Sequence, residues 1–252
     1  MQSNARETLI VDAETQELRM TFGRTFANGY ALQLELPYRH TGAGSLDGFI
    51  DSWHDFFGLP EGARPALPRD SLHISYERDA QRLIDERSAH SGIGDIALRA
   101  GKQLGSTGMT AWLGVKLPTG DADEWTGSGS VDVTAALAAE HALGERFAVF
   151  AQAAGTWLSD GDRLASQQEQ IVWSGVAGIS ARAFERLTLT AQLDAHTAVF
   201  DSNEDFLGDA VMLTLGGAFR VGDRWSLSFA VTEDVAVETA SDVVFVFQIN
   251  RH

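Results

Sequence analysis

Apolar and polar residues alternate with a period of two along most of the chain, and residues 187–200 show the pattern most clearly. Its odd positions, beginning with Leu187, are almost wholly apolar, whereas its even positions include Gln192, Asp194 and His196. Such alternation is typical of a β-strand with one apolar and one polar face. The stretch is much longer than the usual strand of about five or six residues. A length of this kind favours a strand that crosses a membrane, which needs about ten residues.

The connections between alternating stretches also form a pattern. Alternation occupies residues 17–26 and 30–38, with the hairpin signal Asn28-Gly29 between them, and resumes from residue 94 to the end. Short turns near positions 27, 105, 144, 185 and 222 alternate with longer loops that begin near positions 41, 118, 159, 201 and 238. Short turns on one rim and long loops on the other are typical of outer-membrane barrels. Eleven strands follow Glu17, and we expect the segment before Asp12 to supply a twelfth, which would place both ends at the short-turn rim.

The distribution of charge indicates which face meets which solvent. The polar face carries a charged or imidazole side chain at the positions that we expect to line a lumen: Glu17, Arg19, Glu35, Arg39, Asp95, Arg99, Lys116, Asp132, Glu140, Arg182, Asp194, His196, Arg220 and Asp234. The apolar face carries only Arg24, Lys102 and Glu233, all near strand ends. Since Lys or Arg on a lipid face costs about 2–4 kcal/mol at the bilayer midplane, this distribution fits lipid outside.

The sequence therefore predicts an all-β fold, a closed antiparallel up-and-down transmembrane β-barrel of about twelve strands that forms one domain over residues 1–252. The alternative is a water-soluble barrel or sandwich with its apolar face buried, in which strands are usually shorter. A closed barrel of twelve strands with its polar face inward could not also bury its apolar face without lipid.

Residues 41–90 interrupt the alternation and are expected to form a long extracellular loop. Ser45 is a candidate N-cap, and helical spacing of apolar residues predicts an amphipathic helix over residues 46–57 that Gly58 ends. Residues 72–76 fit a short strand, and the remainder is charged and irregular. The helix would fold into the mouth as a plug or lie on the outer-leaflet surface, and its aromatic stripe is formed by Phe49, Trp53, Phe56 and Phe57.

Composition excludes several classes of function. The net charge of −16 leaves no basic stripe for nucleic acid. The chain has no Cys, which excludes a disulfide framework, a thiolate metal site and a Cys nucleophile. No run of about twenty apolar residues predicts a transmembrane helix. The N-terminus shows no signal peptide, so an exported protein would carry one that this sequence lacks.

Three clusters are candidates for chemistry. Asp194 and His196 share a polar face and could serve a hydrolase if a Ser lay nearby, although a network of lumen hydrogen bonds is the simpler interpretation. Residues 71–73 and 53–55 each bring His beside Ser or Asp in the long loop, without a third partner. Asp121, Asp123 and Glu124 could hold a hard cation, but the spacing of an EF-hand is missing and a solvated acidic loop is favoured. We predict no metal and no cofactor.

Several motifs resemble a known family. SLDGFIDSWHDFFGLPEGARP with PRD, then SGIGDIALRAG and KLPTGDADEWTGSGSVD, are similar to an uncharacterised family of proteobacterial outer-membrane proteins known only as a domain of unknown function. The resemblance covers most of the chain from about Leu18. The shorter PTGD…GSGSVD pattern of residues 118–132 also resembles the outer-membrane family linked with the phenol-degradation meta pathway, which is supposed to move hydrophobic compounds. Neither family supplies active-site residues. One departure is the end of the chain, residues 248–252, because such barrels usually end on an aromatic residue; Phe247 is the nearest one.

Together these observations predict a narrow channel or carrier for small molecules, with hydrophobic ones as candidates, in the outer membrane of a Gram-negative bacterium. The expected partners are outer-membrane lipid, a small-molecule solute and the barrel-assembly machinery during biogenesis. Two alternatives stay open, an outer-membrane barrel enzyme of the hydrolase type and a structural or adhesive barrel that acts through its loops.

Overall fold

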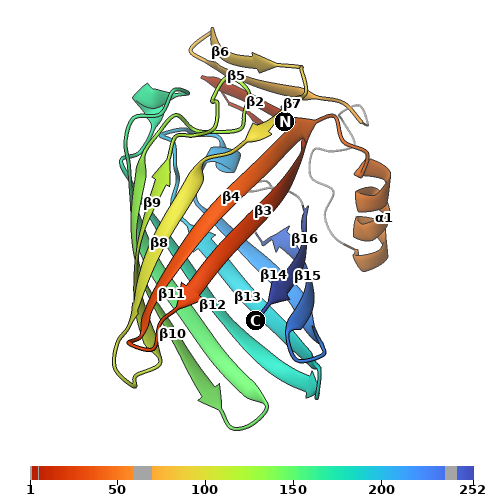
Figure 1. The fold of residues 1–252 in the computed structure, drawn as a ribbon. Coiled ribbons are helices and arrows are strands. Elements are labelled where there is room, and N and C mark those ends of the chain that lie inside the picture. The colour runs from red at the N-terminus through yellow and green to blue at the C-terminus, as the bar shows by residue number, and fades with distance from the viewer. Residues whose placement is uncertain (1, 5, 59–69, 236–242) are drawn as a thin grey trace.

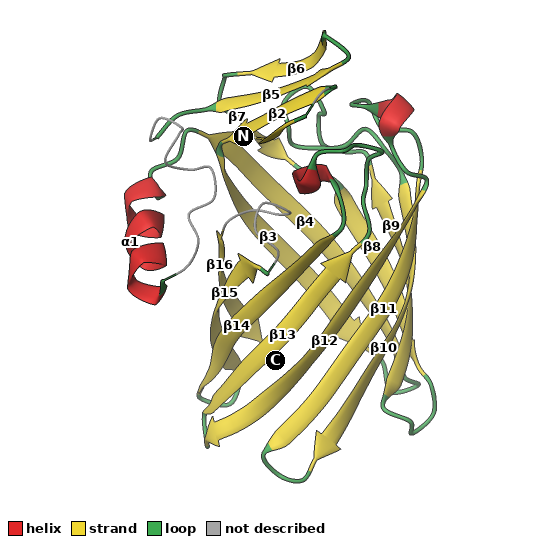
Figure 2. Cartoon of the chain, turned by 180° about the vertical axis from the view of Figure 1, so that it is seen from behind, coloured by secondary structure: helices red, strands yellow, loops and turns green. Residues whose placement is uncertain are grey.

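The computed structural model describes residues 2–4, 6–58, 70–235 and 243–252. Its strands form two sheets (Figures 1 and 2). The large sheet contains β3 (Glu14–Thr25), β4 (Tyr30–Gly42), β7 (His90–Ile93), β8 (Ile96–Gln103), β9 (Met109–Leu117), β10 (Asp132–Leu143), β11 (Phe147–Leu158), β12 (Ile171–Phe184), β13 (Leu187–His196), β14 (Ala210–Val221), β15 (Trp225–Asp234) and β16 (Val243–Arg251). The small sheet contains β1 (Gln2–Ser3), β2 (Glu7–Asp12), β5 (His73–Arg78) and β6 (Gln81–Glu86). The helices are α1 (Asp47–Phe57) and two short 3₁₀ helices, Ala165–Gln167 and Asp205–Leu207.

The large sheet is antiparallel throughout, and each long strand pairs with its neighbour in the chain. Its first hairpin closes at the predicted place, where Gly29 has a φ of 78° that favours glycine. The sheet has twelve strands, which confirms the predicted all-β antiparallel fold. The prediction that the segment before Asp12 supplies the twelfth strand is wrong, because residues 7–12 form β2 in the small sheet. The additional strand is instead β7, which lies in line with β8 along β4.

The sheet curls into a wall whose two edges are β3 and β16 (Figure 1). Both edge strands run from the long-loop rim to the short-turn rim, so the chain enters the wall at the rim opposite to the predicted one. Among the described residues no pairing joins β3 to β16, and predicted closure of the barrel is therefore not confirmed. Both faces of β3 are exposed beyond its first residue, as expected for an edge strand.

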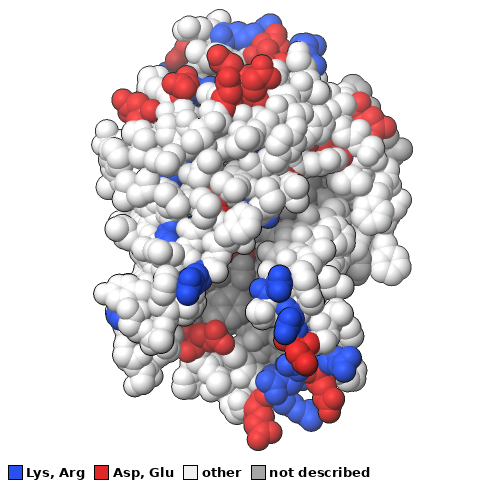
Figure 3. Space-filling view, in the orientation of Figure 1, with Lys and Arg blue, Asp and Glu red and all other residues white. Residues whose placement is uncertain are grey.

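Burial in the wall is inverted relative to a water-soluble protein. In β13, Leu189 and Leu193 are 48% and 49% exposed, whereas Thr190, Gln192 and Asp194 on the other face are half-buried. Large apolar side chains are exposed on the other wall strands as well, and most of them are Leu, Ile, Val and Phe. Charged side chains gather toward the two ends of the molecule, with a belt of mostly uncharged residues between them (Figure 3). The apolar face is thus the outer surface of the sheet.

The small sheet, called the cap sheet from here on, lies at the long-loop rim (Figures 1 and 2). It corrects the prediction for residues 77–86, which were expected to be irregular and instead continue β5 and form β6. Unlike the wall it has a core, in which Leu9 is 5%, Ile74 9% and Tyr76 0% exposed.

The helix α1 lies outside the wall, beside β15 and β16 (Figures 1 and 2). It begins at Asp47, within a residue of the predicted start, and the Glu14 carboxylate accepts the N–H groups of Ser45 and Leu46 ahead of it. Within the described part of the chain, no helix has the length and apolar character needed to cross a membrane.

Candidate functional site: the inner face and its cap

All fourteen residues predicted to line a lumen lie on the polar, inner face of the wall or in line with it. Thirteen are in strands. Asp95 directly precedes β8 and is an even number of positions from Arg99, so an extended chain places both side chains on the same face. The structure joins eight of the fourteen in ion pairs, from Glu17 on β3 to Asp132 at the start of β10.

The first inner-face cluster joins β3 and β4. One Glu17 oxygen lies 2.6 Å from Arg19 and the other lies 2.8 Å from Arg39. On β4 and β8, Glu35 and Arg99 approach to 3.1 Å. The Glu17–Arg39 and Glu35–Arg99 pairs join neighbouring strands, and opposite charges placed in this way stabilise a sheet. Their partial exposure to solvent limits each to a small contribution, about 0–1 kcal/mol.

A second cluster surrounds Lys116 on β9. Its ammonium lies 2.7 Å from Asp132 and 3.2 Å from Asp95. Asp95 also accepts the backbone N–H groups of Gly120 and Ser128, each at 3.0 Å. The carboxylate thereby fixes the long loop after β9 against the wall, so that this cluster has an evident structural role.

The inner face of β11 to β16 is built differently. Asp194 accepts hydrogen bonds from Gln192 at 2.8 Å and from Thr214 at 3.1 Å, and Thr214 also meets Thr232 at 2.8 Å. His196 approaches the Thr197 carbonyl oxygen at 3.0 Å. Ser174 lies directly opposite His196 on the neighbouring strand, but among the described residues no hydrogen bond links Asp194, His196 and a Ser. The arrangement of a hydrolase triad is therefore absent from this part of the chain.

The cap sheet crosses the mouth of the wall. Its chain connections lead to β3 and β7 on one side, while its side chains contact the loops after β11 and β13 on the other. Glu7, which is 2% exposed, accepts hydrogen bonds from the Ser202 hydroxyl at 2.7 Å and the Asn203 N–H at 2.9 Å, and pairs with Arg78 at 3.2 Å. Burial alone would raise the pKa of Glu7, but these two hydrogen bonds and the Arg78 charge lower it below its ordinary value.

Further contacts fasten the same edge of the cap sheet. The Tyr76 hydroxyl donates to the Gln167 side chain at 3.0 Å, and Arg78 donates to the Asp201 carbonyl at 2.9 Å. Glu204 is 3% exposed and accepts a hydrogen bond from Asn4 at 2.8 Å. Burial, followed by the nearby charge of Glu7, raises the pKa of Glu204.

His90 provides a second anchor, where the chain returns from the cap sheet to the wall. Its ring nitrogens lie 2.6 Å from Glu124 and 3.0 Å from Glu86. The hydrogen bond with Glu124, despite partial desolvation and with help from Glu86, raises the pKa of His90. Backbone N–H groups, that of Ser88 first, lower the pKa of Glu86 to about 2, so this carboxylate stays ionised over the physiological range.

The other candidate clusters have structural partners. Asp121 accepts the N–H of Asp123 at 2.8 Å within its own loop, and Glu124 is engaged by His90. Among the described residues, no three His, Asp or Glu side chains are placed to hold a metal ion. Ser71 donates to Asp12, and His73 lies 3.3 Å from Asp85.

The aromatic stripe of α1 does not enter the mouth, so the plug interpretation is wrong for the residues that can be placed. The rings of Phe49 and Trp53 lie 5.5 and 5.8 Å from that of Phe245 on the outer face of β16. The Trp53 indole donates to Glu233 at 2.9 Å, and Phe56 is 82% exposed. The side chains of Phe57 and His54 lie outside the described residues.

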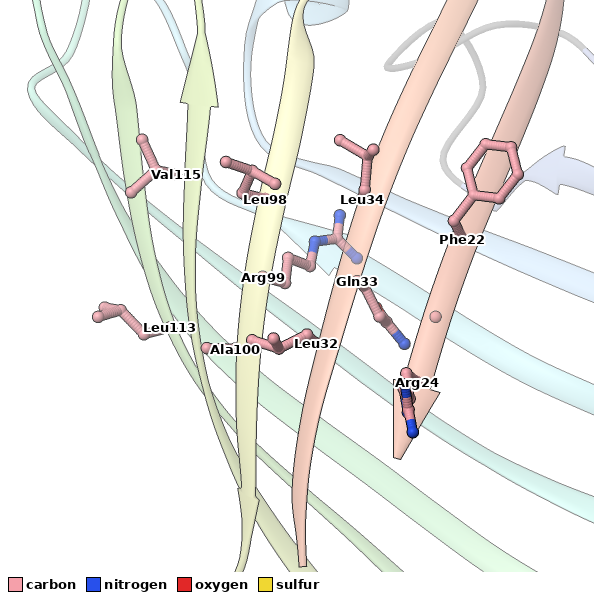
Figure 4. Close-up of a pocket in the computed structure, with 11 residues that line it drawn as sticks. Phe22, Arg24, Leu32, Gln33, Leu34, Leu98, Arg99, Ala100, Leu113 and Val115 are labelled. Carbon is pink, nitrogen blue, oxygen red and sulfur yellow. The ribbon is translucent and has the colours of Figure 1, made fainter. Parts of the chain in front are cut away.

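A groove of about 540 Å³ lies on the outer face over β3, β4, β8 and β9 (Figure 4). Its lining is mostly apolar, with the small side chain of Ala100 among larger ones, and also includes Gln33 and Arg99. Arg24 lies at the end of the groove nearest the short-turn rim. The larger lining side chains are Phe22, Leu32, Leu34, Leu98, Leu113 and Val115.

Sequence reasoning missed the residues that fasten the cap sheet. One signal was present, since Glu7 shares the face of Leu9 and Val11, and a carboxylate on an apolar face needs a partner. Glu233 gave a similar signal for the position of α1. It is a charged residue on the outer, apolar face, close to a run of aromatic residues on the same face, and therefore needs a partner. Their partners are far away in the chain, so alternation could not identify them.

Comparisons with known proteins agree with this geometry. A family model described as "Protein of unknown function (DUF3187)" matches residues 1–251, which confirms the predicted resemblance to a family of unknown function. No curated protein matches the chain significantly. The COG4313 outer membrane channel from Pseudomonas putida F1 is 16% identical, with 100% of this chain and 98% of that chain covered, and a TM-score of 0.54. That likeness shows a shared fold.

Two other solved structures are less similar. CymD, described as a monoaromatic hydrocarbon channel, is 14% identical with a TM-score of 0.45, and the match covers 99% of this chain and 78% of that chain. BamA from Haemophilus ducreyi is 9% identical with a TM-score of 0.40, over 95% of this chain and 55% of that chain.

Proposed function

We propose that this chain, which belongs to the DUF3187 family, is an outer-membrane channel for small uncharged molecules, hydrophobic ones included. The observation that carries the proposal is the inverted burial of the wall, whose leucines and phenylalanines are exposed while its polar side chains face inward. In water such a surface would aggregate, whereas in a bilayer it is the expected exterior. The fold shared with a protein described as an outer membrane channel supports the same conclusion.

The fourteen inner-face residues would then line the channel, with the ion pairs described above on β3 to β10. Because those acids and bases pair with one another, they offer a passing ion little net charge. A wall of this width lies between the filled eight-stranded and the open sixteen-stranded barrels, so the pore is narrow.

The cap sheet would lie on the extracellular side, because long loops mark that rim in outer-membrane barrels. With Glu7 and Tyr76 fastened to the loops opposite its chain connections, it restricts entry to the lumen. Outer-membrane lipid would surround the wall, and the barrel-assembly machinery would insert it. Backbone groups at the edges of β3 and β16 would need partners in the hydrocarbon layer, so we expect the two edges to meet in the bilayer.

The test uses the full chain refolded into liposomes and planar bilayers. Swelling with small neutral solutes and a low single-channel conductance are the expected results. Replacing Tyr76 and Glu7 together (Y76A/E7Q) should raise the conductance by releasing the cap sheet, whereas deleting residues 45–58 should leave it unchanged because α1 lies outside the wall. Liposomes that contain the inserted chain but show neither swelling nor conductance would refute the channel.

A further inference from the structure

Three cations stand on the outer, apolar face at the short-turn rim. Arg24 lies 5.2 Å from the ring centre of Phe26, Lys102 4.0 Å from that of Tyr30, and Arg251 5.8 Å from that of Trp225. None of the three forms an ion pair with a carboxylate of the described residues.

The inner-face cations differ in this respect. Arg39, Arg99 and Lys116 each have a carboxylate within 3.2 Å. The inner cations of β4, β8 and β9 are therefore neutralised within the wall, whereas the outer three are not paired with a carboxylate among the described residues. Lys102 does donate to the Asn28 carbonyl oxygen at 2.6 Å. Cations and aromatic rings at such a level are typical of a membrane interface, where the side chains reach lipid headgroups.

Only two of the outer cations adjoin the groove. Arg24 is part of its lining, and Lys102 lies two residues after Ala100 on the same outer face of β8. One strand, β4, separates β3 from β8, so the two backbones are roughly 10 Å apart. Both side chains are long enough to approach one anion placed over β4. Arg251, on β16, is not among the residues that line this groove.

We propose that this groove binds an anionic phospholipid, with an acyl chain along Leu32 and Ala100 and the headgroup phosphate between Arg24 and Lys102. The inference depends on the membrane location in the proposed function and not on transport. If the long loops are extracellular, the short-turn rim faces the periplasm, where the outer membrane presents its phospholipid leaflet. The groove then supplies apolar contact at the depth of the acyl chains, and the two cations supply the charge that an anionic headgroup completes.

Native mass spectrometry of the full chain in detergent micelles can test the site by counting bound phosphatidylglycerol against phosphatidylcholine with identical acyl chains. We expect one preferred phosphatidylglycerol. Loss of one cation should weaken its binding about fivefold and loss of both (R24Q/K102Q) about twentyfold. Arg251→Gln is the matched control, because it removes an equally outward, aromatic-stacked cation at the same rim away from the groove.

A second pair of variants tests the groove without altering charge. Ala100→Leu fills part of the groove and should lower the number of bound lipids, whereas Ala153→Leu adds the same volume to the outer face of β11 and should not. Equal binding of the two lipids, or equal losses in R24Q/K102Q and R251Q, would overturn the proposal. A chain that conducts solutes yet shows no lipid preference refutes only the lipid site, and a chain that binds the lipid but conducts nothing refutes only the channel.

Discussion

The cap sheet and the wall use the same alternating pattern and bury opposite faces. In the cap sheet Leu9 and Tyr76 are buried, and alternate residues such as Thr8 and Ser75 are half-buried on the opposite face. In the wall Leu189 and Leu215 are exposed at 48% and 53%, and the polar partners are turned inward. Each arrangement satisfies the hydrophobic effect only in its own solvent. A period of two therefore specifies a strand with two unlike faces, while the surrounding medium decides which face is covered.

The two regions also treat charge differently. Where the cap sheet meets the loop after β13, Glu7 and the loop residue Glu204 are only 2% and 3% exposed, and each accepts a hydrogen bond from the other side of the contact. The wall keeps its charges partly exposed on the inner face and pairs them with near neighbours. The docking of the cap sheet thus depends on a few side-chain contacts, each of which would be costly to lose. The wall depends on many backbone hydrogen bonds between neighbouring strands. Single substitutions should affect the two regions accordingly.

The largest effect is expected at Tyr76. Tyr76→Ala removes a fully buried ring, and such truncations cost about 3–5 kcal/mol. The cost should appear as faster hydrogen exchange of β2 and β5 amides, with no change in β10 to β13. Tyr76→Phe is the control, because it removes only the hydrogen bond to Gln167, worth about 1 kcal/mol. If Y76A loosened the wall as much as the cap sheet, the two regions would not be independent.

A charge on the outer face should give the next largest effect. Leu215→Lys places an ammonium at the middle of β14, where lipid exposure costs about 2–4 kcal/mol in the free energy of folding. Ala218→Lys, on the inner face of the same strand, should cost far less because the lumen is polar. Chemical unfolding of both variants in bilayers measures the difference. Equal costs would show that the outer face does not meet hydrocarbon.

Much of the wall could be predicted because its information is local. Alternation, the Asn28-Gly29 hairpin and the order of short and long connections each depend on residues close together in the chain. The inner-face positions of Lys116 and Asp132 could also be placed, because parity along a strand fixes the face.

The cap sheet could not be predicted in the same way. β2 shows the alternation of a wall strand, and its pairing with β5 rather than β3 joins segments more than sixty residues apart. Glu7 meets Ser202 across 195 positions of the chain, so no local pattern reports the contact. The placement of α1 depends likewise on Trp53 and Glu233, 180 residues apart.

Acid should loosen the cap sheet through Glu7. Its folded pKa is lowered, so its contribution is present above the ordinary value of 4.5 and is lost as pH falls through the folded value. Glu7→Gln should weaken docking at neutral pH by about 1.5–3 kcal/mol, the range for hydrogen bonds to a charged group, and should abolish this acid dependence. Hydrogen exchange of β2 between pH 7 and pH 4 is the measurement. Glu204 acts in the opposite sense, because its raised pKa favours the docked cap when it is protonated.

The smallest effect is expected at His90, on the alkaline side. Its folded pKa is raised above 6.5, so the stabilisation is complete below that pH and is lost as pH rises through the folded value. Glu86 stays ionised throughout this pH range, so the change in stability with pH reflects the titration of His90 and not that of Glu86. Because the Glu124 side chain is 56% exposed, screening limits the contribution to about 0.2–1 kcal/mol. His90→Gln should remove the pH dependence of β6 and β7 exchange between pH 6 and pH 8.5, measured at low salt, and leave that of β2 below pH 5 intact. If His90→Gln abolished both the alkaline and the acid pH dependence, the His90 and Glu7 contacts would not act independently.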